Sequence, residues 1–176
     1  TLVMSRKHGF VNLYGIFGFT GAENQKPPDK RNMDKVRRII KYSVDRWGAY
    51  VDFWEFLNEQ KADQEWYAVT VPYLKSIDPY HHIVTTSWER PEIEGIDVSA
   101  PHWYANEDEL VSEEVMGGKG REFKKFKKPV VFGEQGNSYG GKGKAGVGGW
   151  GGVWDPLSAR RMRARLWGAL FNELAL

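Results

Sequence analysis

Two glutamates follow apolar runs of the sequence, at points where buried strands would end. Glu59 comes directly after Asn58 in the stretch WEFLNEQ, and Glu134 follows the run PVVFG. A carboxyl group that keeps its proton can donate it to a leaving oxygen, while an ionised carboxylate can attack a carbon centre. Pairs that divide these roles cleave glycosidic bonds. The surroundings of each carboxyl group decide which role it takes, so the residues alone do not assign the two roles.

Polar or aromatic residues end the intervening apolar runs as well. They form two short sequences, Ser87-Trp88-Glu89 and His102-Trp103-Tyr104. In α/β folds the carboxyl ends of parallel strands meet at one edge of the sheet, and ligands bind there. We therefore expect Glu59 and Glu134 to face each other across one mouth.

The elements that must position these residues follow from the hydrophobic pattern. We predict five strands, over residues 10–19, 50–57, 82–87, 96–102 and 129–133. Apolar residues recur three or four apart between them, which predicts helices starting at Pro27-Pro28-Asp29, Asp63, Asn106 and Asp155-Pro156. Strands that are apolar on both faces and alternate with helices predict an α/β fold with a parallel sheet. The short connection WERPEIEG is unusual, because a parallel crossover needs about a dozen residues.

The apolar stripes predict the buried face of each helix. Pro72 lies inside the helix predicted to start at Asp63, and it predicts a kink or a break there. The predicted stripe of the last helix is Ala159, Met162, Leu166, Leu170 and Leu174. Trp47, Trp66 and Trp167 lie on helix stripes, and we expect them in the core.

Composition excludes several classes of function. The chain has 176 residues, enough for one sizeable core, and aromatic residues make up 14% of it. A net charge of +2 gives no support for a nucleic-acid or membrane partner, and the lack of cysteine excludes disulfides and thiolate metal sites. No run reaches the length of a membrane span. The opening TLVMSRKHGF predicts a cut within a longer protein.

Three motifs, WEFLNEQ, PHWY and VVFGEQG, together resemble the strand-end motifs of the retaining glycoside hydrolases of clan A. The cellulase-like and mannanase-like enzymes of family 5 are the nearest. The resemblance implies a (β/α)8 TIM-barrel fold, here partial, with residues 1–176 forming a single catalytic domain. The chain offers about five strand–helix units, similar to strands three to seven, and lacks counterparts of strands one, two and eight.

The resemblance also implies roles for individual residues. Glu59 is similar to the clan's general acid/base and Glu134 to its nucleophile. Asn58 resembles the amide that binds the sugar 2-hydroxyl, Tyr104 the phenol that hydrogen-bonds the nucleophile, and His102 a neighbour in the same subsite. The implied substrate is a β-glycan, with no metal and no organic cofactor.

Aromatic residues near the predicted mouth have two interpretations. Trp88, Trp103 and Trp150 can stack on a sugar ring, as can Trp154, and ordinary packing is the alternative. Glu55 either points the same way as Glu59 or pairs with a buried arginine, and the sequence leaves this open. The stretch GNSYGGK is followed by glycine where a phosphate-binding loop needs serine or threonine, so we interpret residues 136–152 as a substrate-covering loop.

The incomplete barrel leaves a second function open. A non-catalytic carbohydrate-binding or assembly module derived from a truncated glycosidase barrel is the alternative to a hydrolase. An open barrel exposes sheet edges, which predicts a homo-oligomer or an additional chain that completes it. Nucleic-acid binding through the Lys- and Gly-rich loop has less support, given the small net charge.

Overall fold

The computed structural model describes residues 1–18, 30–87, 89–105, 111–136 and 157–176, which form two compact units, Thr1–Val98 and Ser99–Leu176. Each unit has its own hydrophobic core. Several predicted features lie outside the described residues. They are the helix starts at Pro27-Pro28-Asp29, Asn106 and Asp155-Pro156, the loop beyond Gly136, and Trp88, Trp150 and Trp154.

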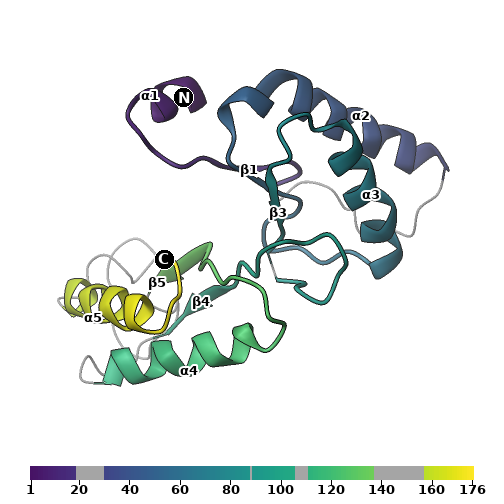
Figure 1. Cartoon of the computed structure of the whole chain (residues 1–176). Helices are drawn as coiled ribbons and strands as arrows, with labels where there is room; N and C mark the ends of the chain where they lie inside the picture. Colours follow the sequence, from purple (N-terminus) through teal and green to yellow (C-terminus); the bar gives the residue numbers. More distant parts are fainter. Residues whose placement is uncertain (19–29, 88, 106–110, 137–156) are drawn as a thin grey trace, which may run out of the picture. The chain divides into compact units, whose positions relative to one another are not determined.

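The first unit is a three-stranded parallel sheet with helices (Figure 1). Its elements in chain order are α1 (Leu2–Lys7), β1 (Leu13–Gly15), α2 (Lys30–Trp47), a 3-10 turn (Gly48–Tyr50), β2 (Phe53–Glu55), α3 (Gln64–Ile77) and β3 (Ile83–Thr85). The strand order is β1-β2-β3, with Leu13 opposite Phe53 and Phe53 opposite Ile83. The parallel α/β arrangement is confirmed, although each strand is shorter than predicted.

The predicted stripe of α2 is confirmed. Met33, Val36, Ile40 and Val44 are all buried in the first core, and Trp47 packs against it. Spacings of three and four residues place these side chains on one helix face. The periodicity alone therefore predicted which face of α2 covers the sheet.

Helix α3 also buries predicted core residues, with Trp66 and Leu74 almost fully inaccessible. The helix is continuous through Pro72, so a break at this residue is wrong. Pro72 itself is exposed, and the buried neighbours Thr70 and Val71 hold this part of the helix against the core. Packing of this kind can offset the loss of one backbone hydrogen bond at a proline.

The first predicted strand, over residues 10–19, is wrong in extent and in burial. Phe10 is 66% exposed and Val11 is 70% exposed, and only Leu13–Gly15 forms strand β1. Among the described residues β1 has one neighbouring strand, β2, so its outer side lacks a partner to cover apolar residues. The helix α1 that precedes it was not predicted.

The second unit pairs two parallel strands beside two helices (Figure 1). Its elements are β4 (His102–Tyr104), α4 (Ser112–Lys124), β5 (Glu134–Gly136) and α5 (Ser158–Phe171). The strands begin later than predicted, because residues 96–101 and 129–133 contribute only isolated bridges such as Ser99–Val130. Helix α4 continues past Met116 to Lys124 and packs against α5.

The predicted buried face of α5 is wrong. Its buried residues are Arg161, Arg165, Gly168 and Ala169. Four residues of the predicted stripe lie outside this set, namely Ala159, Met162, Leu166 and Leu170, and Trp167, which we expected in the core, is 55% exposed. A Cβ added to Gly168 would lie 3.1 Å from Cα of Glu113, so the small residues of α5 face α4 because they allow the two helices to approach closely.

None of the helices in the described ranges is long and apolar enough to span a membrane.

Candidate active site

The residues predicted around the nucleophile meet on the paired strands of the second unit. Glu134 begins β5 and lies directly opposite His102, the first residue of β4. The phenol of Tyr104 donates a hydrogen bond to Oε2 of Glu134. Nδ1 of His102 lies 3.9 Å from the same oxygen. Three side chains expected at one subsite are therefore in one place.

Their exposure differs in a way that suits a binding surface. The side chain of His102 is 2% exposed, whereas that of Glu134 is 46% exposed. Tyr104 is also open to solvent. A buried imidazole thus backs a carboxylate that a ligand can reach from outside.

Gly133 makes room for the buried imidazole. A Cβ added at this position would lie 3.1 Å from Nε2 and 3.2 Å from Cδ2 of His102. Both distances are tighter than ordinary van der Waals contact between carbon and a ring atom. The glycine immediately before Glu134 is therefore needed to hold His102 where it is.

Arg165 of α5 contacts the carboxyl ends of both strands. Its Nη1 donates to Oε1 of Gln135 and to the carbonyl of Gly136, each at 2.9 Å, and its Nη2 donates to the carbonyl of Ala105, also at 2.9 Å. The guanidinium lies 4.5 Å from the ring centre of Trp103, and Arg165 is 1% exposed. Sequence reasoning missed this residue, because α5 carries four arginines and nothing in their pattern marks Arg165 as one of the two that are buried.

The interaction of Arg165 bears on the predicted role of Trp103. One face of the indole lies against the guanidinium, and the ring also packs against Phe132 at 6.3 Å between centroids. Trp103 is partly buried against the second core. Stacking of Trp103 on a sugar therefore stays a prediction, with one ring face already engaged.

The predicted acid/base lies in the first unit, in the segment that follows β2. Asn58 and Glu59 are both partly buried, and Glu59 has a φ of 50°. A positive φ is uncommon outside glycine and occurs often at functional sites. The side-chain amide of Gln60 donates to the carbonyl of Gly18 at 3.2 Å, which fixes the chain just beyond Glu59.

Glu55, whose orientation the sequence left open, is buried beside the next strand. Its Oε1 accepts a hydrogen bond from the hydroxyl of Ser87, which follows β3. On the other side, a Cβ added to Gly15 of β1 would lie 3.3 Å from Oε2 of Glu55. Glu55 therefore spans all three strands of the sheet at their carboxyl ends.

A hydroxyl network supports the chain just before Asn58. The backbone N–H of Leu57 donates to Oγ1 of Thr86 at 3.3 Å, and this oxygen is 3.1 Å from the phenol oxygen of Tyr67. Burial raises the pKa of the Tyr67 phenol above its ordinary value, although the contact with Thr86 acts in the opposite direction. The phenol thus stays neutral and available as a donor at neutral pH.

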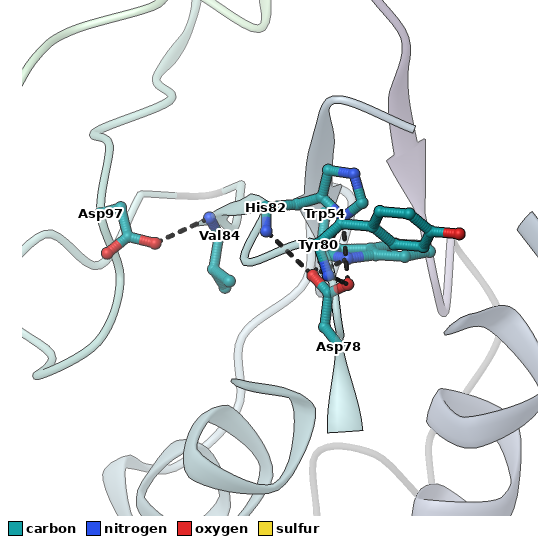
Figure 2. Close-up of polar contacts among 6 residues, drawn as sticks. All are labelled: Trp54, Asp78, Tyr80, His82, Val84 and Asp97. Atoms are coloured by element: carbon teal, nitrogen blue, oxygen red, sulfur yellow. Dashed lines mark hydrogen bonds and ion pairs between the residues drawn. The ribbon is translucent and has the colours of Figure 1, made fainter. Parts of the chain in front are cut away.

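A second polar cluster in the first unit lies at the amino end of β3 (Figure 2). Asp78 accepts hydrogen bonds from the indole of Trp54 at 3.1 Å and from the backbone N–H groups of Tyr80 at 3.1 Å and His82 at 2.9 Å. Nδ1 of His82 lies 2.9 Å from the same carboxylate. Asp97 accepts from the N–H of Val84 at 2.9 Å.

A pocket of about 310 Å³ opens beside this cluster. The cluster nevertheless has a structural explanation, because both carboxylate oxygens of Asp78 already accept hydrogen bonds that join α3, β2 and β3. His81 has a φ of 55°, as expected of a turn residue before a strand. This pocket lies at the amino end of β3, whereas Asn58 and Glu59 follow the carboxyl end of β2.

Comparison with solved structures shows the fold. A hyperthermostable endo-1,4-β-D-mannanase from Thermotoga petrophila RKU-1 matches 99% of this chain and 65% of its own, with a TM-score of 0.67 and 15% identity. A family 5 mannosidase from Rhizomucor miehei matches 77% of this chain and 49% of its own, with a TM-score of 0.58 and 14% identity. The chain therefore has the fold of part of these glycoside hydrolase structures.

A β-glucuronidase from Bifidobacterium dentium also matches, over 97% of this chain and 30% of its own. The TM-score of this match is 0.58 and the identity is 12%. The chain spans less than two thirds of the length of these structures, which confirms the prediction of a partial TIM barrel. No protein-family model and no curated protein sequence matches the chain.

Proposed function

We propose that the protein is a retaining glycoside hydrolase that cleaves β-glycosidic bonds by double displacement. Glu134 is the nucleophile: its carboxylate attacks the anomeric carbon and forms a glycosyl ester as the bond to the leaving oxygen breaks. Glu59 donates its proton to that oxygen. It then takes a proton from the water that attacks the ester, which releases the sugar and restores both carboxyl groups.

The observation that carries this proposal is the hydrogen bond from Tyr104 to Glu134. An ionised carboxylate only accepts hydrogen bonds, and here the phenol is the donor. The bond fixes the rotation of the carboxylate while leaving it accessible to a ligand. Such preorganisation is what a nucleophile needs in order to attack without reorienting.

The proposed substrate is a β-glycan, with mannan as the first candidate. Of the structures that match this chain, the one from Thermotoga is named a mannanase and the one from Rhizomucor a mannosidase. The reaction needs no metal and no organic cofactor, since proton transfer and displacement are carried by carboxyl groups. Asn58, His102 and Trp103 are proposed to bind the sugar, together with Trp88 and Trp150.

The second candidate is a carbohydrate-binding or assembly module without catalysis. It is favoured by one observation, namely that the chain spans less than two thirds of the structures it matches.

Release of reducing sugar from mannan, β-glucan, xylan and galactan tests both candidates. The wild-type protein would be compared with Glu134→Gln and with Glu114→Gln, an exposed glutamate of α4 that serves as the matched control. The hydrolase predicts release by wild type and control and none by Glu134→Gln. If all three proteins bind glycan equally and none releases reducing sugar, the result supports the non-catalytic binding module. Light scattering on the same samples gives the oligomeric state.

A further inference from the structure

We infer that Arg165 is a positioning residue for the proposed nucleophile. The inference rests on the proposed function, and it concerns a residue from the last helix that none of the sequence motifs contains. Arg165 is almost fully buried, although a guanidinium is costly to remove from water unless its donors are satisfied. Its contacts explain what this burial achieves.

The guanidinium joins the ends of the two strands that carry the site. Nη1 donates to Gly136 and Nη2 to Ala105, and these carbonyls belong to β5 and to the residue that follows β4. The N–H of Ala105 also donates to the carbonyl of Gly136 at 3.0 Å. Arg165 therefore binds both strands at their carboxyl end, just beyond Tyr104. Without it, the hydrogen bonds at the end of a two-stranded ladder would open more easily.

The same group fixes the residue next to the nucleophile. Nη1 donates to the side chain of Gln135, which directly follows Glu134. A planar fork holds several acceptors at fixed angles, and the indole of Trp103 lies 4.5 Å from its centre. Lysine has one compact donor group and no such plane. The arrangement thus transfers the rigidity of α5 to the strand pair on which Tyr104 meets Glu134.

The test compares Arg165→Lys and Arg165→Met with Arg163→Met, an exposed arginine of the same helix. Hydrolysis of an aryl β-mannoside or β-glucoside gives kcat and KM. Misplacement of a reacting group by about 1 Å can cost roughly 100-fold in rate. We expect kcat to fall by about 100-fold in Arg165→Met and by about 10-fold in Arg165→Lys, with KM within about twofold. Arg163→Met should keep wild-type values.

Hydrogen exchange at the N–H of Ala105 gives a second measure that needs no activity. We expect it to quicken in both Arg165 variants and to stay unchanged in Arg163→Met. If Arg165→Met does not fold, Arg165→Lys carries the test. A lower melting temperature with kcat and exchange unchanged overturns the inference, because it indicates a purely structural role.

The exchange measurement separates failure of this inference from failure of the proposed function. If the wild type hydrolyses no glycoside, the proposed function fails and no nucleophile remains to be positioned. Faster exchange in the Arg165 variants then still establishes the contact between α5 and the strand ends. Wild-type hydrolysis with normal kcat in Arg165→Lys overturns the positioning role alone.

Discussion

The phenol of Tyr104 donates a hydrogen bond to the carboxylate of Glu134 from the neighbouring parallel strand. Glu134 is paired in register with His102, two residues before Tyr104, so both partners of the carboxylate come from the same face of β4. A strand of three residues therefore supplies two of the side chains that surround the proposed nucleophile.

Removal of the phenol hydroxyl tests what this hydrogen bond does. Tyr104→Phe keeps the ring, which is 42% exposed, so we expect stability to change by less than about 0.5 kcal/mol. Loss of a preorganised donor should lower kcat by roughly 100-fold. Steady-state kinetics and thermal unfolding measure the two effects. An unchanged kcat in an active enzyme contradicts the proposed role of Tyr104.

Gly133→Ala tests the packing behind the site. The added methyl would lie 3.1 Å from Nε2 of His102, so the imidazole must leave its present position beside Glu134. We expect a destabilisation of about 1–3 kcal/mol, typical of overpacking, together with reduced hydrolysis. Combining the change with His102→Ala, which removes the ring, should restore part of the lost stability. Equal losses in the single and double variants would show that the ring is not the group displaced.

The close packing of α4 against Leu174, which follows α5, gives a prediction about stability alone. A Cβ on Gly120 would lie 2.3 Å from Cδ1 and 3.0 Å from Cγ of Leu174, which belongs to the second core. Gly120→Ala should therefore destabilise the protein by about 1–3 kcal/mol. Gly118→Ala is the matched control, since its nearest neighbour is 3.9 Å away, and it should stabilise α4 by about 0.8 kcal/mol. Denaturant unfolding of both variants distinguishes packing from helix propensity.

Asp78 predicts a dependence of stability on pH. Burial acts to raise the pKa of this carboxyl, but the N–H groups of His82 and Tyr80 and the indole of Trp54 outweigh it and lower the pKa below its ordinary value. A lowered folded-state pKa contributes stability above the unfolded value of about 3.9, and this contribution is lost as pH falls through the folded value.

Asp78→Asn should consequently cost about 1–3 kcal/mol at pH 7, because several buried donors lose an ionised acceptor. The difference from wild type should narrow as the pH falls below about 4. Urea unfolding at a series of pH values measures it, with the exposed Asp45→Asn as control. A difference that stays constant down to pH 3 rules out this account of Asp78.

The sequence predicted the parts of the fold in which each local pattern agrees with the packing. In α2 the apolar residues recur on one face and that face is buried, so periodicity was sufficient. In α5 the apolar residues Met162, Leu166 and Leu170 face outward, while Arg165 faces in. Periodicity could not reveal this, because the contacts of Arg165 depend on carbonyl groups brought near by tertiary structure.

The candidate site shows the same division. Motif spacing predicted Tyr104 and Glu134 at the carboxyl ends of strands. Tyr104 does end β4, whereas Glu134 begins β5, and the parallel register of the two strands brings the side chains into contact. The supporting contact of Gly133 involves a residue that carries no chemistry of its own and gave no signal. Ser87 was predicted only as a polar residue at a strand end, and its hydrogen bond to Glu55 was not predicted. Strand lengths were overestimated for a similar reason, since an apolar run shows burial but not where hydrogen-bonded pairing begins.

The central claim is that Glu134 attacks the sugar, and covalent trapping tests it most directly. A 2-deoxy-2-fluoro glycoside with an activated leaving group slows hydrolysis of the glycosyl ester, so the adduct accumulates and can be weighed by mass spectrometry. We predict an increase of one fluorosugar, located on Glu134 by peptide mapping, and none in Glu134→Gln. A folded wild-type protein that hydrolyses glycosides but carries the adduct on another residue, or forms none, would contradict the claim.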